Sequence, residues 1–149
     1  METFRCRGYQ AGEVAKLLIR KFIDNDRYIS NLILQKMLFF VQRHSLKQDR
    51  SIIFPENFEA WKFGPVVPKV YYDFCHYGSF PLEIDPQEVL LKDPGLEGII
   101  DDEFELWHDK TPYQMVQNTH RPGSAWHVIF DDGRGLRKPI PVSLIYERG

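Results

Sequence analysis

The sequence predicts a mainly α-helical protein, a single compact helical domain over residues 1–149 with a short β-hairpin near residues 51–63. Three observations support this prediction. Apolar residues recur at helical spacing in several segments, strand-like alternation is confined to one short stretch, and neither a repeat nor a linker divides the chain. The 11 Phe, 7 Tyr and 3 Trp residues supply enough buriable surface to exclude a disordered chain.

Two helices are expected in the first third of the chain. Over residues 9–24, Ala11, Val14, Leu18 and Phe22 share one side at helical spacing. A second helix is expected over residues 31–46, with Ser30 as its N-cap. Because apolar side chains occur on nearly all of its faces, we expect this helix to be buried at the centre of the domain.

The middle of the chain is expected to be extended and then to turn sharply. Residues 51–63 suggest a hairpin whose turn is Pro55-Glu56-Asn57. Gly64-Pro65 is expected to end this hairpin and to begin a helix that stops at Gly78. The remaining chain is expected to form a loop over residues 79–97, helices over residues 98–108 and from Thr111-Pro112 to His120, a short helix capped by Ser124, a loop over residues 131–139 and a last helix from Pro141 to Arg148.

The charge is unevenly distributed, although the whole chain has a formal net charge of only −2. Residues 1–50 carry ten Lys or Arg and five Asp or Glu, whereas residues 83–109 carry ten acids and one base. The near-zero total excludes a general binder of polyanions. Two readings of the acidic stretch remain open, a solvated surface and a face that guides a basic partner.

The two cysteines and the hydropathy indicate the compartment. Cys6 and Cys75 form neither a disulfide framework nor a metal-binding knuckle, so we expect free thiols in a reducing compartment. Composition alone favours burial of both as small apolar residues. The N-terminal segment is polar, and no apolar stretch approaches the roughly 20 residues that span a bilayer. We therefore expect a cytoplasmic protein with no membrane partner.

Catalytic and metal-binding patterns are weak. The five histidines lack the spacing of metal ligands, but His120 and His127 flank a Pro-Gly break. A small His-based metalloprotein, with Asp131 or Asp132 as a further ligand, is therefore kept as a minor alternative. No serine lies in a nucleophile elbow, and no glycine-rich loop has the context of a phosphate site. We expect no enzyme activity, no cofactor and no metal.

Nucleic-acid binding is also considered and not expected for this chain alone. Lys16, Arg20 and Lys21 make the first expected helix basic, which is compatible with a helix-turn-helix module. The second expected helix argues against it, because a recognition helix exposes polar side chains to base edges and this one is apolar.

The most informative segment is residues 59–68, EAWKFGPVVP. One glycine and two prolines within five positions fix an abrupt corner, with Trp61 and Lys62 just before it. An aromatic ring and a cation on a rigid backbone make a good contact surface, because little side-chain freedom is lost on binding. The alternative that Trp61 packs in the core stays open.

Three stretches resemble the Panacea domain, also called the SocA-like antitoxin domain. Residues 31–40, NLILQKMLFF, are similar to the LQKLLYF helix of the family, and residues 59–71, EAWKFGPVVPKVY, are similar to its A-W-x-[YF]-G-P-V-x-P-x-V-Y corner. Thr119-His120 with Trp126 is similar to its T-H-x-x-x-P-W ending, although Ala125 stands where the family tends to place proline. The resemblance spans about residues 11–130.

The resemblance implies a bacterial or phage-associated antitoxin that neutralises a cognate toxin by direct protein–protein binding. The alternative that it leaves open is a proteolytic adaptor or phage regulatory module that delivers a partner to a AAA+ protease. A homo-oligomer also remains open. The residues expected to bind the partner, or else only to hold the fold, are Trp61, Lys62, Phe63, Gly64, Pro65, Val66, Thr119, His120 and Trp126.

Overall fold

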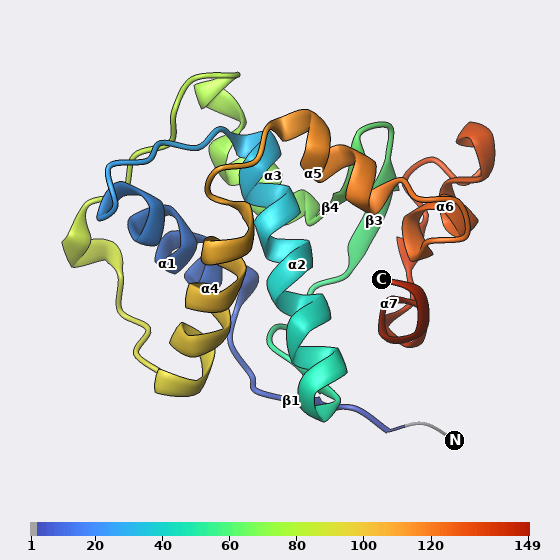
Figure 1. The fold of residues 1–149 in the computed structure, drawn as a ribbon, viewed down its shortest axis with the longest axis horizontal. Coiled ribbons are helices and arrows are strands. Elements are labelled where there is room, and N and C mark those ends of the chain that lie inside the picture. Colours follow the sequence, from blue (N-terminus) through green and yellow to red (C-terminus); the bar gives the residue numbers. More distant parts are fainter. Residues whose placement is uncertain (1–2) are drawn as a thin grey trace.

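One long helix, α2 (Asn31–Asp49), runs through the middle of the computed structural model, which describes residues 3–149 (Figure 1). Its first turn is capped by Ser30, whose hydroxyl accepts a hydrogen bond from the amide of Ile33. Side chains on all of its faces are buried. The predicted central helix is therefore confirmed, and it continues to Asp49 rather than ending at residue 46.

Helices α1 (Ala11–Ile23) and α4 (Pro94–Trp107) pack against each other and against α2 (Figure 1). The apolar side predicted for α1 is buried. Helix α4 begins four residues before the expected position 98, because the Asp93 side chain caps its first turn. The rings of Phe22 and Phe104 meet edge-on, with centroids 4.9 Å apart, and join the two helices.

A short hairpin is confirmed, but it lies further along the chain than expected. Strands β3 (Phe58–Trp61) and β4 (Gly64–Val66) pair antiparallel, so the turn consists of Lys62 and Phe63. Strand β5 (Pro139–Ile140) pairs with the other edge of β3, which gives the order β4-β3-β5. The hairpin is therefore supported by a strand whose residues pair with positions at least 80 residues earlier in the chain.

The segment expected to form the first strand of that hairpin pairs elsewhere. Strand β2 (Ser51–Ile52) runs parallel to β1 (Arg5–Cys6). The amides of Arg7 and Tyr9 extend this pairing by donating to backbone carbonyls of residues 52 and 53. The N-terminal segment thus supplies the partner that the hairpin prediction assigned to residues 58–63.

Pro68, rather than Pro65, begins the next helix. Pro65 lies within β4, and α3 (Pro68–Phe74) starts at the second proline of the corner. Proline is favourable at the first helical position because the N–H there has no partner within the helix. Gly78 ends the following 3-10 turn, η1 (Cys75–Tyr77), as expected.

The C-terminal third follows the predicted order of short helices. Thr111 caps α5 (Pro112–Thr119), and Ser124 caps α6 (Ala125–Phe130). Each hydroxyl accepts a hydrogen bond from an amide in the first helical turn, which otherwise lacks a partner. The remaining elements are η2 (Pro86–Glu88), η3 (Asp131–Gly133) and α7 (Val142–Arg148).

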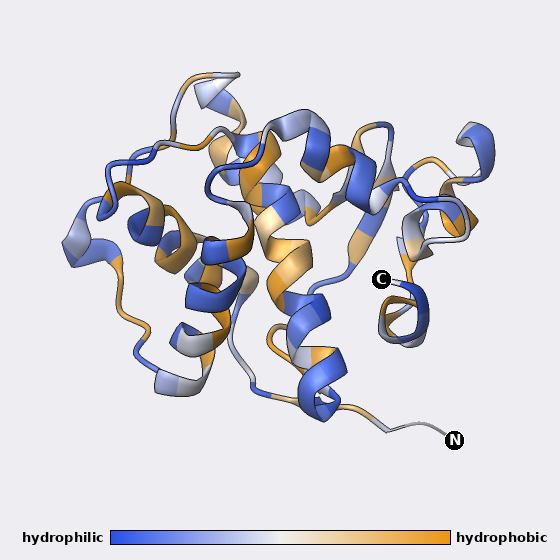
Figure 2. Ribbon diagram, viewed as in Figure 1, coloured by the Kyte–Doolittle hydropathy of each residue, from blue (hydrophilic) through white to orange (hydrophobic). Residues whose placement is uncertain are grey.

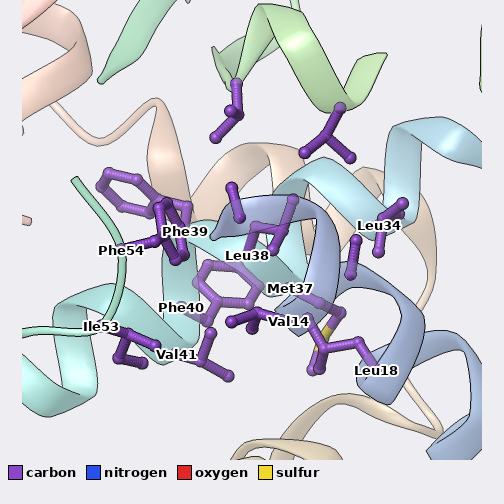
Figure 3. Packing of buried hydrophobic residues seen from close by; sticks show 14 of the residues in the cluster. Val14, Leu18, Leu34, Met37, Leu38, Phe39, Phe40, Val41, Ile53 and Phe54 are labelled. Atoms are coloured by element: carbon purple, nitrogen blue, oxygen red, sulfur yellow. The ribbon is translucent and has the colours of Figure 1, made fainter. Parts of the chain in front are cut away.

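The buried apolar residues, apart from Val66, form one cluster around α2. Figure 3 shows side chains of α1, including Leu18, meeting side chains of α2 such as Met37. Phe39 of α2 and Phe58 of β3 meet edge-to-face, with centroids 5.3 Å apart. In Figure 2 the central turns of α2 are hydrophobic and its last turns hydrophilic, so the core is centred on the middle of this helix.

Two further sequence predictions concern the cysteines and the absence of a membrane-spanning segment. Cys6 and Cys75 are free, as expected, but both are exposed, so the expectation that they are buried was wrong. Their elements, β1 and η1, lie at the surface rather than in the core. None of the helices within residues 3–149 has the length and apolar character needed to cross a membrane.

Candidate functional site

The turn of the β3–β4 hairpin brings five of the predicted site residues together. Lys62 and Phe63 form the turn, and the side chain of Phe63 is 59% exposed. Gly64 follows with a φ of +121°, a conformation that residues with a Cβ rarely adopt. Pro65 and Val66 continue into the buried strand. The turn thus requires glycine at position 64 and leaves Phe63 facing solvent.

Trp61 lies at the end of β3 and is partly exposed rather than packed in the core. Its ring meets that of Tyr71 edge-on at 5.0 Å, and the guanidinium of Arg137 lies over it at 4.6 Å. The indole Nε1 donates to the carboxylate of Glu59 at 2.9 Å. A cation–π contact at an exposed site contributes about 0.5–1 kcal/mol, so these contacts restrain the ring on the surface of the hairpin.

An apolar groove of about 420 Å³ lies beside this turn. Its walls come from the first turn of α2, from the hairpin and from the segment of α3 and η1. Within residues 3–149, Lys62 is the single charged residue that lines it. The side chains that give the groove its apolar character include Leu32, Trp61, Phe63 and Tyr71, and Cys75 lies at its wall.

Buried hydrogen bonds fix one wall of the groove. The Asn31 side-chain amide donates to the carbonyl of Tyr71, and it accepts from the side-chain amide of Gln35. The backbone amide of Val67 donates to Gln35 Oε1 at 2.9 Å. Because each buried group left unpaired costs about 1–3 kcal/mol, these bonds hold the start of α2 to the start of α3.

The third stretch of predicted site residues packs at the base of the hairpin and does not line the groove. Trp126 Nε1 donates to the carbonyl oxygen of Trp61 at 2.7 Å. The imidazole of His120 stacks on the indole of Trp126, with centroids 3.6 Å apart and the planes 1° from parallel. Thr119 is buried, and its hydroxyl donates to the carbonyl of Val116.

A buried lysine that was not among the predicted site residues completes this side of the turn. Lys36 of α2 is 1% exposed, and its Nζ has no hydrogen-bond partner among residues 3–149. A Cβ placed on Gly64 would lie 2.5 Å from Lys36 Nζ and 3.1 Å from Thr119 Oγ1. The amino group therefore lies against the backbone of Gly64. The sequence feature that could have identified Lys36 is its position in the most apolar part of the expected central helix.

Burial shifts both titratable groups at the base of the turn toward the neutral state. Burial lowers the pKa of Lys36 from 10.5 to about 7. Burial is also the main reason that the pKa of His120 falls to about 4; the charge of Lys36 lowers it further, and a hydrogen bond between the imidazole and the backbone of Phe63 opposes the shift. His120 Nε2 is buried without a hydrogen-bond partner within residues 3–149. Two unpaired buried nitrogens thus lie on one side of the hairpin.

The contacts around His127 are those of a helix end and a turn. Its Nδ1 accepts a hydrogen bond from the amide of Gly123 at 3.1 Å. Asp131 is paired with the guanidinium of Arg134. Across the part of the chain that the structure describes, no three His, Cys, Asp or Glu side chains gather where they could hold a metal ion.

The acidic stretch of residues 83–109 is spread over η2, α4 and the chain between them, on the side of α2 that also carries α1 (Figure 1). Part of its charge is paired within the chain. Asp101 lies 2.8 Å from Lys21 Nζ, and the buried carboxylate of Glu103 lies 2.8 Å from His44 Nδ1. Guidance of a basic partner by the remaining acids stays a prediction.

Residues 34–127 match the model of the family described as Antitoxin SocA-like, Panacea domain. The match covers more than half of the chain and includes the hairpin, Lys36 and the stacked rings of His120 and Trp126. The chain therefore belongs to this family, and the resemblance predicted from the sequence is confirmed.

One relative is Antitoxin SocA of Caulobacter vibrioides (strain NA1000 / CB15N). It is 46% identical over 68 residues, which are 46% of this chain and 36% of that protein. The alignment thus spans little more than a third of the relative. No solved structure matches the chain.

Proposed function

We propose that the protein is an antitoxin that neutralises a cognate toxin by binding it directly, with the hairpin turn and the groove as the contact surface. Membership of the SocA-like family supports the antitoxin role. The observation that carries the contact surface is the exposed ring of Phe63 beside an apolar groove. The toxin itself is identified only as a protein partner that buries this surface.

The physical properties of the surface suit a protein partner. Phe63 and Leu32 both line the groove and are both exposed to water. Apolar surface gains about 25 cal/mol per Å² when it is removed from water, and buried aromatic anchors often contribute 2 kcal/mol or more to an interface, by a rough general rule. The bonds of Asn31 and Gln35 hold the groove wall in place before binding, so little ordering of the backbone opposes association.

Neutralisation by binding requires no catalytic step. The groove is mostly apolar and has Lys62 as the one charged residue among its described lining, which is the character of a contact surface rather than of a reaction centre. We therefore propose a non-enzymatic, regulatory protein that meets its toxin in the cytoplasm.

The test is coexpression with the gene next to that of this protein. We expect the neighbouring product to arrest growth, the wild-type chain to restore growth and Phe63→Ala to lose this protection. Leu106→Ala is the matched control, because the exposed fraction of Leu106, 58%, is similar to that of Phe63. Leu106 lies on α4, outside the hairpin and the groove. A purified pair should show the same ranking of affinities by calorimetry.

Three results would change the proposal. A neighbour that is not toxic removes the antitoxin role. Full protection by Phe63→Ala retains that role but removes the groove as its contact surface. Rescue that disappears when a host AAA+ protease is deleted replaces direct neutralisation with the adaptor alternative.

A further inference from the structure

Two buried nitrogens beneath the hairpin turn have no hydrogen-bond partner within residues 3–149, Nζ of Lys36 and Nε2 of His120. In folded proteins about nine-tenths or more of buried polar groups are hydrogen-bonded, so two such groups at one place require an explanation. They come from different elements, α2 and the end of α5, and both lie against the backbone of residues 63–64. We infer that Lys36 and His120 form a site for one oxyanion of the carboxylate class.

The chemistry of the two groups selects an anion. An ammonium group has three donors and no acceptor, and an imidazole with its proton on Nε2 adds a fourth donor. Hydrogen bonds from charged donors to carboxylates are among the strongest that proteins make. A cation would instead be repelled by the protonated amino group of Lys36, which is the form that an anion stabilises.

No carboxylate of the described chain already occupies this role. Burial alone lowers the pKa of Lys36, without an opposing contribution from any acidic side chain among residues 3–149. The groups that influence His120 are Lys36, His127 and the backbone of Phe63, which is hydrogen-bonded to the imidazole, and none of them is a carboxylate. A negative charge supplied from outside would therefore be the counterion that the folded chain lacks.

The fold offers one direction of approach. His120 is partly exposed at the end of α5, next to the turn that presents Phe63. The amino group of Lys36 fills the space that a side chain at position 64 would occupy, and the flexible stem of lysine allows that group to move toward His120. A partner docked on the turn would present an acidic side chain or a terminal carboxylate from this side. That source rests on the proposed function, whereas the site itself is independent of it.

The first experiment uses the isolated chain with acetate as the probe, against chloride at equal ionic strength. The Cε and Hε signals of Lys36 are followed by NMR as a function of pH. We expect acetate to raise the pKa of Lys36 by about one unit or more and to shift the ring signals of His120. Lys21 is an internal control, because its Nζ already pairs with the carboxylate of Asp101 at 2.8 Å and should not respond.

The second experiment uses the complex with the toxic neighbour, measured by calorimetry at pH 8 in two buffers of different ionisation enthalpy. Wild-type chain should take up close to one proton on binding, because a neutral Lys36 becomes charged beside the carboxylate. Lys36→Met should abolish this uptake and weaken binding about thirtyfold or more. Since removal of an unpaired buried amine should stabilise the fold, weaker binding by this variant does not reflect unfolding.

The two arms separate the sources of the anion. A response to acetate assigns the site to free carboxylates, and proton uptake only in the complex assigns it to the partner. If acetate leaves the pKa of Lys36 unchanged and the complex takes up no proton, the inference is overturned. If no neighbour is toxic, the proposed function fails, and the acetate titration alone tests the site. An unchanged pKa of Lys36 in acetate then overturns the inference.

Discussion

Trp126 Nε1 donates a hydrogen bond to the backbone carbonyl of Trp61, with 2.7 Å between the two atoms. This bond joins α6 to the last residue of β3, directly before the hairpin turn. The same indole stacks with His120, so one side chain holds both the turn and the histidine beneath it. The position of Phe63 at the surface thus depends on a residue more than 60 positions later.

Replacement of Trp126 by phenylalanine should loosen the turn without removing the stacked ring. The carbonyl of Trp61 loses its donor, so we expect the free energy of unfolding to fall by about 1–3 kcal/mol in urea titrations. Amide exchange of residues 61–64 should become faster. Trp107→Phe is the control, because Trp107 donates to Glu103 on its own helix and should leave exchange in the hairpin unchanged. Unaltered protection of the turn in Trp126→Phe would contradict this account.

Gly64→Ala should be strongly unfavourable. The residue combines a φ of +121° with a Cβ position 2.5 Å from Lys36 Nζ, so both the backbone and the lysine must shift. We expect a loss of about 1–3 kcal/mol in the free energy of unfolding. In Gly98→Ala the new methyl group, within α4, meets nothing within 4 Å, and this change should stabilise by about 0.5–1 kcal/mol. Equal effects of the two substitutions would be incompatible with the geometry of the turn.

Stability should rise with pH between about 7 and 10.5. The folded chain binds a proton at Lys36 with a pKa of about 7, whereas the unfolded chain retains that proton up to 10.5. The unfolded state therefore holds more protons in this window, which gives a slope approaching about 1.4 kcal/mol per pH unit. Lys36→Met should remove this slope and exceed the wild-type stability at pH 7.

The difference in unfolding free energy between wild type and Lys36→Met, measured at pH 7, 8 and 9, isolates this effect from other titrations. A difference that stays constant would show that Lys36 is not held neutral. Below pH 7, the titration of His120 also makes the free energy of unfolding increase with pH. Its folded pKa of about 4 lies below its usual 6.5, so stability should fall as the pH drops through that interval.

Gln35→Leu should destabilise the groove wall even though leucine suits an apolar helix. The backbone amide of Val67 and the side-chain Oδ1 of Asn31 both lose their partner, which we expect to cost about 1–3 kcal/mol in the free energy of unfolding. Gln48→Leu makes the same chemical change at an exposed position of α2 and should be nearly neutral. Thermal unfolding of the two variants side by side measures the contrast, and a neutral Gln35→Leu would argue against the buried bonds.

Local signals in the sequence were sufficient to predict the helices. Ser30, Thr111 and Ser124 cap helices where a hydroxyl precedes an apolar repeat, and α2 is central because its apolar residues surround it. The hairpin was misplaced because Pro55-Glu56-Asn57 is a strong local turn signal. The actual pairing depends on β5 and on the N-terminal β1, which are distant in sequence and were not recognisable as strands.

The candidate site was predicted in part for a similar reason. The corner at residues 61–66 is encoded locally by one glycine and its neighbouring prolines. The role of Lys36 is not, because a lysine in a helix ordinarily reaches water and its burial depends on strands and helices that close over it. Cys75 shows the reverse, since a residue type that is often buried lies at the surface of η1.

That surface position makes Cys75 an intrinsic attachment point for an optical reporter. Its thiol lies at the wall of the groove, and the other cysteine, Cys6, is on β1. In a Cys6→Ser variant, an environment-sensitive dye coupled to Cys75 would sit where a docked segment excludes water. Filling of the groove could then be followed in real time by a blue shift in emission, with no residue added to the contact surface.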